Sequence, residues 1–256
     1  RLFQYRFSAG GVLEGHSFGN LFLSALTTIT GSLEKAVQAS SQVLSVQGQV
    51  IPATGTDVML WAELEDGEKI FGESLIGKSV KPISRIGCLP ENPPALKNAI
   101  EAIKEADLIV LGPGSLYTSL LPNLLVPEIV EELLKNNSPK IYISNLMTQP
   151  GETDGLDVYQ HIKSIEKQLL NFGVNKRIFN AILSQIEFEE SSLIDYYRSR
   201  GAEPVICDKR KLISEGYYVL QAPLYARRIT PTLRHDSRRL SRAVMFLYRK
   251  IKKVNQ

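Results

Sequence analysis

The chain has 256 residues, of which 43% are hydrophobic and 22% are charged, and its formal net charge is +3. This composition is that of an ordinary soluble globular protein, long enough for one large α/β domain or two small ones. No apolar run approaches the ~20 residues that span a bilayer, and no signal-peptide pattern is present, so membrane insertion is not expected. The two cysteines, Cys88 and Cys207, are far apart and lack metal-ligand spacing, which suits a reducing, cytoplasmic location.

The charge is unevenly distributed along the chain. Residues 225–256 contain ten Lys or Arg and a single acid, Asp236. Such a segment can contact nucleic acid or an anionic surface, or it can be the solvated face of a helix. An apolar stripe favours the helix, so nucleic acid is not expected as a partner. The stripe consists of Leu240, Ala243, Val244, Leu247 and Ile251.

The amino-terminal segment predicts two helices and a strand. Ser17 is a suitable N-cap residue, and the apolar density of residues 21–29 predicts a buried helix. A second helix is predicted over 33–44 and a strand over 49–54. His16 and Asn20 lie at the amino end of the first helix. There His16 can either contact a ligand phosphate or be hydrogen-bonded within the fold, and the sequence leaves both open.

An antiparallel hairpin is predicted next. Apolar residues alternate over 58–65, Asp66-Gly67 is typical of a type I′ turn, and 69–73 can form the return strand. We expect this hairpin to be inserted in, or appended to, a parallel sheet. A short strand over 83–89 and a helix over 95–105 follow.

Two strand-and-loop units in the centre of the chain are the best candidates for a binding site. The apolar runs 108–111 and 140–146 show no alternation, as in strands buried on both faces of a parallel sheet. Each run leads into small and polar residues at the carboxyl end of its strand, where open α/β sheets bind ligands. The first loop contains Gly112, Pro113, Gly114, Ser115 and Thr118, and the second contains Asn145, Thr148 and Gln149.

Glycines let the first loop turn tightly, and the amides that open the following helix suit a phosphate or another anion. Taken alone, Gly-Pro-Gly-Ser is also an ordinary strand-to-helix turn. The second polar loop favours a shared ligand cleft, because neighbouring parallel strands would place both loops on one rim.

The rest of the pattern alternates helices and strands, as in a right-handed doubly wound sheet. The segment 233–236, Leu-Arg-His-Asp, precedes the last helix and can either cap it or bring an anion-binding Arg to the rim. His161 lies on the inward stripe of a helix and is interpreted as a packed residue. The predicted helices cover 128–136, 157–171, 189–200 and 237–253, and the predicted strands cover 177–183, 204–208 and 217–222.

Several phrases together resemble the gluconeogenesis-factor family of bacteria, also described as CofD-like. They are residues 15–21 (GHSFGNL), 62–67 (AELEDG), 106–119 (ADLIVLGPGSLYTS), 145–155 (NLMTQPGETDG) and 234–236 (RHD). The resemblance covers essentially the whole chain. It implies a Rossmann-like three-layer α/β/α fold, with a mainly parallel sheet and an antiparallel hairpin insertion, and a cytoplasmic location.

The resemblance also implies ligand-binding roles for residues that match the family's phrases. It supports both central loops and adds His16, Asn20, Arg234 and His235, but it assigns no catalytic residue. Family members begin with a strand, a glycine-rich loop and paired aspartates that do not occur in this sequence. Residues 1–256 are therefore expected to form a single CofD-like domain without its first strand.

The family's two groups give two functional hypotheses. One is a regulatory protein that binds UDP-sugars, notably UDP-N-acetylglucosamine, and supports cell shape and growth on gluconeogenic carbon sources. The other is a transferase that moves 2-phospholactate from a nucleotide-activated donor to a deazaflavin, with a divalent cation such as Mg²⁺ to neutralise phosphate charge. Glu152 and Asp154 are the only acids in the central loops, and they would make a sparse metal site.

A third class, the NAD-linked oxidoreductases, is disfavoured. No Gly-x-Gly-x-x-Gly motif is followed by an acid about twenty residues later. A homo-oligomer is compatible with the sequence, which does not define the number of copies.

Overall fold

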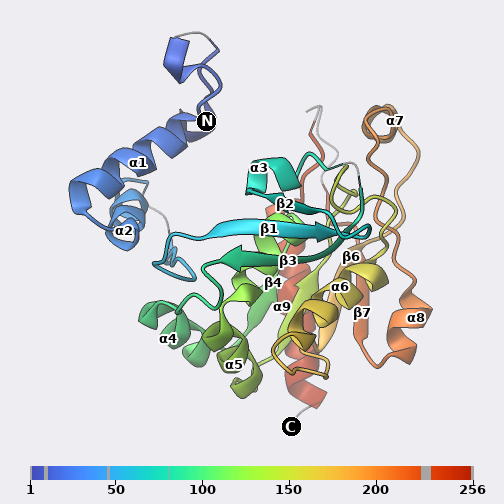
Figure 1. Cartoon of the computed structure of the whole chain (residues 1–256). Coiled ribbons are helices and arrows are strands. Elements are labelled where there is room, and N and C mark those ends of the chain that lie inside the picture. Colours follow the sequence, from blue (N-terminus) through green and yellow to red (C-terminus); the bar gives the residue numbers. More distant parts are fainter. Residues whose placement is uncertain (1, 9–10, 45–46, 80, 226–231, 255–256) are drawn as a thin grey trace.

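Two β-sheets form the body of the protein, as the computed structural model shows (Figure 1). The structure describes residues 2–8, 11–44, 47–79, 81–225 and 232–254. The parallel sheet has the order β4 (Ile109–Leu111), β5 (Lys140–Ile143), β6 (Ala181–Gln185) and β7 (Tyr218–Ala222). The antiparallel sheet has the order β2 (Lys69–Phe71), β1 (Met59–Leu64) and β3 (Ile83–Leu89).

Helices surround these sheets. Two short helical turns follow β4, namely the π-helical η3 (Leu116–Leu120) and the 3₁₀ turn η4 (Leu121–Leu125). The α-helices of the body are α3 (Glu73–Ile76), α4 (Lys97–Glu105), α5 (Pro127–Lys135), α6 (Val158–Leu170), α7 (Ser192–Arg198), α8 (Lys209–Ser214) and α9 (Ser237–Val254).

Helices cover both faces of the parallel sheet. β5 and β6 are buried along their whole length. Tyr142 and Ile182 belong to the core on the α6 side, whereas Ile141 and Leu183 belong to the core on the α9 side. Alternate residues of one strand thus enter two different cores, which explains the unbroken apolar runs and confirms the three-layer fold.

The predicted hairpin is present, with Ala62 paired to Ile70 across an antiparallel ladder. It is not part of the parallel sheet, because β1 pairs on its other side with β3. β3 lies against η4 and α6, where Ile86 shares a core with Leu124 and Ile165. The antiparallel sheet therefore packs on the outer side of the helical layer that contains η4 and α6, and the inner side of this layer packs on the parallel sheet.

Two predicted strands are wrong. Residues 49–54 form no strand and make one isolated bridge, from Thr54 to Ala95, in the part of the chain that the structure describes. Residues 204–208 make one bridge, between Pro204 and Met147, and Asp208 then caps α8. Proline has no N–H to donate and cannot extend a ladder, and a capping aspartate favours the helix start instead.

The amino-terminal segment forms an arm that projects from the body (Figure 1). It comprises η1 (Leu2–Gln4), η2 (Gly11–Leu13), α1 (Phe18–Thr30) and α2 (Leu33–Val43). Ser17 caps α1 as predicted, accepting a hydrogen bond from the backbone N–H of Asn20 at 3.1 Å. The prediction that α1 is buried is wrong, because none of its described residues is buried.

Among the described residues, no helix combines the length and apolarity needed to cross a membrane.

Candidate ligand-binding site

The parallel pairing of β4 with β5 brings the two central loops together. Leu111, the last residue of β4, is in register with Tyr142, close to the carboxyl end of β5. We call residues 112–119 the first rim loop and residues 144–154 the second rim loop. Both leave the same edge of the sheet, as the sequence predicted for neighbouring parallel strands.

A reciprocal pair of hydrogen bonds joins the two rim loops. The side-chain amide of Asn145 donates to the carbonyl oxygen of Gly114 at 2.9 Å, and its oxygen accepts from the N–H of Gly114 at 3.1 Å. Both ends of the Asn145 amide are thus engaged with the backbone of a single residue. An arrangement of this kind fixes the distance and the orientation of the two loops.

A second connection runs from the first rim loop to a buried acid. The hydroxyl of Ser115 donates to Oε1 of Gln149 at 2.6 Å, and Nε2 of Gln149 donates to Oε1 of Glu152 at 2.7 Å. The hydroxyl of Thr118 donates to the same oxygen of Glu152 at 2.9 Å. Glu152 therefore holds residues of both loops at once.

Glu152 is only 4% exposed, and its second oxygen, Oε2, has no hydrogen-bond partner among the described residues. Burial raises the pKa of Glu152, opposed by the hydrogen bond from Thr118 and by the backbone amides of Tyr117 and Thr118. A carboxyl group of the chain itself thus lies at the amino end of η3, where the sequence suggested a ligand anion. The sequence placed Glu152 among the polar groups of the second loop and considered it as a metal ligand, but its burial depends on the tertiary fold and was not predicted.

The two acids of the second rim loop have different hydrogen-bond partners. Asp154 accepts a hydrogen bond from the backbone N–H of Gly151 at 2.7 Å, while Glu152 faces Thr118. Among the described residues, no group of three or more His, Cys, Asp or Glu side chains could hold a metal ion. The donors present in the described residues do not fit a resident Mg²⁺ ion.

Gly112 is required where the first rim loop leaves β4. Its φ angle is +95°, and a Cβ atom there would lie 2.5 Å from the carbonyl oxygen of Ile143. The contact is with backbone, which cannot move aside as a flexible side chain can. The Gly112–Pro113 peptide is cis and continues the turn.

Thr148 faces away from the first rim loop. Its backbone N–H donates to the carbonyl of Glu203 at 2.7 Å, and its hydroxyl accepts from the N–H of Glu203 at 2.8 Å. It lines a cavity of about 570 Å³ at the carboxyl ends of β6 and β7, together with Gln185 and Gln221. This volume lies within the range of roughly 300–1,000 Å³ of small-molecule sites. We call it the rim cavity.

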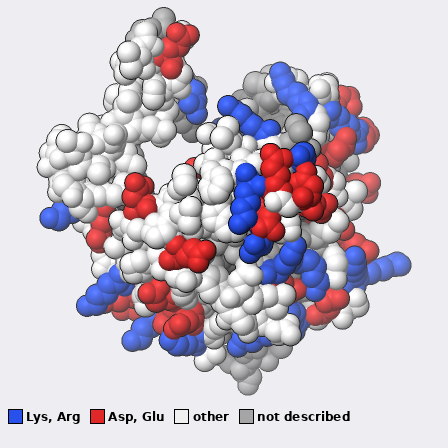
Figure 2. Space-filling view, viewed as in Figure 1, with Lys and Arg blue, Asp and Glu red and all other residues white. Residues whose placement is uncertain are grey.

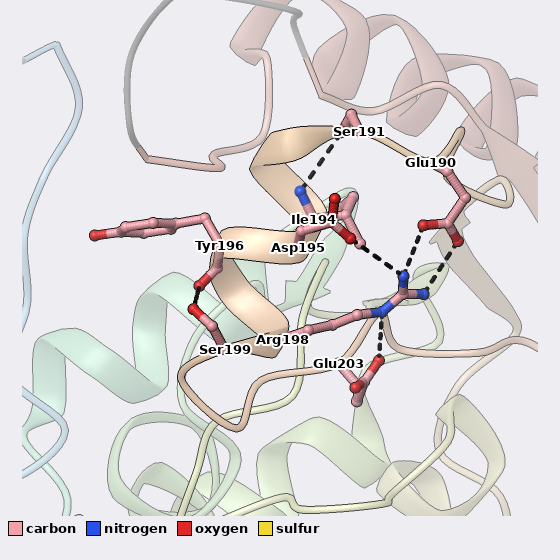
Figure 3. A network of polar contacts seen from close by, with 8 residues as sticks. All are labelled: Glu190, Ser191, Ile194, Asp195, Tyr196, Arg198, Ser199 and Glu203. Atoms are coloured by element: carbon pink, nitrogen blue, oxygen red, sulfur yellow. Dashed lines mark hydrogen bonds and ion pairs between the residues drawn. The ribbon is translucent and has the colours of Figure 1, made fainter.

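One wall of the rim cavity carries a network around Arg198 of α7 (Figure 3). The guanidinium of Arg198 bonds both carboxylate oxygens of Glu190, at 2.6 and 3.1 Å, and its Nε bonds Glu203 at 3.1 Å. Asp195 lies 3.8 Å away. These carboxylates neutralise the one arginine of the wall, so the rim cavity favours hydroxyl and amide groups over phosphate.

The structure brings His235 to the rim. Burial lowers the pKa of His235, and a hydrogen bond with the backbone of Ser144, at the start of the second rim loop, opposes the shift. Its Nε2 atom is buried and has no partner among the described residues. Asp236 caps α9 by accepting from the N–H groups of Arg238 and Arg239. The capping alternative thus holds for Asp236, and Arg234 is exposed.

His16 and Asn20 are not brought to the rim loops. Both are exposed on the arm, outside the body that carries the rim (Figure 1). His161, in contrast, is completely buried, and its Nδ1 lies 3.0 Å from the hydroxyl of Tyr142. Burial lowers the pKa of His161 to about 4. The prediction that His161 is a packed residue is confirmed.

The parallel sheet between helical layers, with two polar loops joined at its carboxyl edge, defines a Rossmann-like α/β protein. Comparison with known protein families identifies the family within this class. The chain belongs to the family described as 2-phospho-L-lactate transferase CofD, whose profile matches residues 1–225.

Relatives of known description support this placement. The gluconeogenesis factor of Bacillus subtilis (strain 168) is 42% identical over 94% of this chain, which spans 74% of that protein. A relative from Nostoc sp. (strain PCC 7120) is 47% identical over 96% of this chain, which spans only 53% of its length. A crystal structure of an UPF0052 family protein from Bacillus halodurans has a TM-score of 0.86 and 41% identity, covering 95% of this chain and 77% of that one.

Proposed function

We propose that the protein is a cytoplasmic regulatory protein of the gluconeogenesis-factor type, which binds a nucleotide sugar such as UDP-N-acetylglucosamine at the rim. Its role is to support cell shape and growth on gluconeogenic carbon sources. The similarity to gluconeogenesis factors supports the biological role. The geometry of the rim supports the ligand class.

One observation carries the proposal: the polar groups of the two rim loops are paired with one another, and Thr148 of the second rim loop also lines the rim cavity. Asn145 and Gln149 each use both ends of their amides. Thr118 donates to Glu152. A rim whose side chains are already engaged is preorganised, which favours recognition at low entropic cost over the proton transfers of catalysis.

The rim cavity suits the uncharged parts of such a ligand. Ile186, Phe188 and Ile206 supply apolar walls, while Gln221 and Asp157 supply amide and carboxylate groups. Sugar hydroxyls donate hydrogen bonds to acceptors of this kind. In this proposal the phosphates of the ligand lie outside the rim cavity, away from the carboxylates around Arg198.

The family description favours a second candidate, a transferase of the 2-phospho-L-lactate type. His235 and Glu152 both have buried polar atoms without partners among the described residues, and such atoms are available to exchange protons. In this candidate, Mg²⁺ arrives with the phosphates of the donor. Formation of a phospholactyl deazaflavin in the presence of Mg²⁺ would favour the transferase over the regulator.

Titration calorimetry with UDP-N-acetylglucosamine tests the proposal. We expect saturable binding without turnover, weakened about tenfold or more by Ser115→Ala or Asn145→Ala, because each substitution removes a hydrogen bond that preorganises the rim. Asn137→Ala is the matched control, because Asn137 is exposed and lies away from the rim. Circular dichroism verifies that each variant is folded. If no UDP-sugar binds to the folded protein, the proposal is wrong.

A further inference from the structure

A single segment of the chain forms one wall of the rim cavity. We call it the lid; it comprises residues 187–202 and contains α7. Ile194 and Arg198 lie four positions apart, and therefore on one face of α7, and both line the rim cavity. Tyr196 lies on the opposite face, where it is 42% exposed and points away from Arg198 (Figure 3). One face of α7 thus covers the cavity, and the other faces solvent.

The lid is attached at both of its ends. At the amino end, the N–H of Ile186 donates to the carbonyl oxygen of Ala222 in β7 at 3.1 Å. At the carboxyl end, Glu203 is joined to Thr148 by two hydrogen bonds, of 2.7 and 2.8 Å. Between these two anchors, long connections carry α7 away from the helices that cover the sheet (Figure 1). A segment anchored in this way can turn at its ends, where a few residues absorb the change in backbone angles.

Between its anchors, the lid packs sparsely on the body. Among the described residues, Phe188 is the one side chain of the lid that packs against either hydrophobic core, and its ring centroid lies 5.0 Å from that of Tyr225. Ile194 is 1% exposed but belongs to neither core. Its burial depends on the closed position of the lid over the rim cavity. A segment with so few buried apolar contacts separates from the body at a low cost in free energy.

The lid is held in shape by Arg198. Its guanidinium bonds both carboxylate oxygens of Glu190 and lies near Asp195, and its Nε bonds Glu203 at the carboxyl anchor (Figure 3). Bidentate hydrogen bonds fix the direction as well as the distance between two groups. Figure 2 shows acidic and basic side chains side by side at this end of the molecule, as expected for a surface that faces solvent. The contacts of Arg198 join parts of the lid to one another, so the lid can move as one unit.

A hydrogen bond joins the middle of the lid to the rim. The hydroxyl of Tyr197 accepts from the backbone N–H of Leu233 at 2.8 Å. Leu233 lies two residues before His235, which is hydrogen-bonded to the backbone of Ser144 at the start of the second rim loop. We call the bond between Tyr197 and Leu233 the latch. It connects the lid to the same rim on which the ligand is expected.

We propose that residues 187–202 open and close over the rim cavity as one unit, that Tyr197 holds the lid closed, and that Arg198 is the positioning residue that keeps it rigid. Opening breaks the latch and exposes Ile194, so the closed form predominates and the open form is a minor population. A ligand of the rim cavity enters and leaves through the open form. This last step rests on the proposed function, whereas the movement of the lid does not and is tested without ligand.

Thiol labelling of the substitution Ile194→Cys measures how often the lid opens. The side chain at this position is buried, so a maleimide reaches it only through the open form. Adding Tyr197→Phe removes the latch and should speed the labelling about fivefold, the effect of losing one hydrogen bond. Tyr196→Phe is the matched control, because it changes the exposed tyrosine next in the chain and should leave the rate unchanged. Peptide mapping by mass spectrometry separates this site from the two native cysteines.

Two labelling results would overturn the inference. One is an equal rate at position 194 in the two tyrosine variants. The other is labelling of Ile194→Cys as fast as that of Ile213→Cys, whose side chain is exposed on α8, because the lid would then not be closed. Circular dichroism verifies that each variant is folded, and the ligand kinetics below use the native Ile194.

Amide hydrogen exchange separates the role of Arg198 from that of Tyr197. The N–H of Ser199 donates to the carbonyl of Asp195 at 2.9 Å within the lid, so its exchange reports unravelling of α7 and not movement of the whole lid. Arg198→Gln should speed this exchange about fivefold or more, whereas Tyr197→Phe should not change it. Arg200→Gln, on an exposed arginine of the lid, is the control for Arg198→Gln. Equal exchange in the two arginine variants would refute the role of Arg198.

Stopped-flow binding of UDP-N-acetylglucosamine tests whether the lid controls exchange of the ligand. Tyr197→Phe should raise the association and dissociation rate constants about fivefold each and leave Kd within about twofold, because the latch is present with and without ligand. A residue that contacts the ligand would change Kd instead. Unchanged rates in Tyr197→Phe would show that the ligand does not pass the lid. If no UDP-sugar binds to the wild type, the proposed function is wrong, and the labelling alone decides whether the lid moves.

Discussion

Asn145 both donates to and accepts from the backbone of Gly114, a residue 31 positions earlier in the chain. The two hydrogen bonds replace the ladder that ends with β4 and β5, and they continue the pairing of these strands into the rim. The connection between the loops is thus a property of one side chain, which makes it simple to test.

Replacing Asn145 should therefore loosen the rim. Asn145→Ala leaves the N–H and carbonyl of Gly114 without their partner, which costs about 1–3 kcal/mol when such groups are buried. Urea denaturation of the variant and the wild type measures the difference. Asn137→Ala, at an exposed position, should change the free energy of unfolding by less than about 0.5 kcal/mol. Equal stabilities for the two variants would contradict this account of the rim.

Glu152→Gln should change how stability depends on pH. Because burial raises the pKa of Glu152 above its ordinary value of 4.5, the folded chain binds more protons than the unfolded chain just above that pH. The free energy of unfolding then falls as pH rises through the window between the two pKa values. The glutamine variant lacks this titration while still accepting from Thr118. A stability difference between wild type and variant that is constant from pH 4 to neutrality would refute the burial argument.

Gly112→Ala should destabilise the fold more than Gly67→Ala, although the backbone strain is similar at the two positions. Gly112 and Gly67 have φ angles of +95° and +86°, so alanine is strained at both positions. A Cβ at Gly67 meets nothing within 4 Å, whereas at Gly112 it lies 2.5 Å from a backbone oxygen. We expect about 1 kcal/mol of destabilisation at Gly67 and about 3 kcal/mol or more at Gly112. Similar thermal unfolding midpoints for Gly112→Ala and Gly67→Ala would show that the backbone around Ile143 can move to accommodate the new Cβ atom.

His161 should make the protein less stable in acid. Its pKa falls from 6.5 in the unfolded chain to about 4 in the fold, so the unfolded chain binds more protons between these values. The free energy of unfolding decreases as pH drops through this window, by up to about 3 kcal/mol at ~1.4 kcal/mol per unit. His161→Gln should lose this dependence. The effect is opposite in sign to that of Glu152, so the two variants are to be compared with the wild type separately.

The sequence predicted those parts of the fold that depend on local pattern. The apolar runs before Gly112 and Ser144 identified two buried neighbouring strands, and Ser17 identified a helix start. The strand predicted over 49–54 failed because a strand needs a neighbour, which local sequence does not reveal. The burial predicted for α1 failed for the same reason, since an apolar helix does not specify what covers it.

In the candidate site, too, features set by local sequence were predicted, whereas features set by tertiary contacts were not. Gly114, Ser115, Asn145 and Gln149 were expected on one rim and lie together there, although ligand binding by them remains a prediction. The role of Glu152 was not foreseen, because its contact with Thr118 joins residues 34 positions apart. His16 and Asn20 were grouped with the rim by resemblance, yet the arm keeps them outside it.

The position of β4 has a further consequence. Among the described strands, β4 is one of the two edge strands of the parallel sheet, so the first rim loop has a strand neighbour on one side only. Its order depends on the second rim loop, through Asn145 and Gln149. By thermodynamic linkage the dependence is mutual. A ligand that touches either loop alone would slow amide hydrogen exchange in both, and the two would open and close as one cooperative unit.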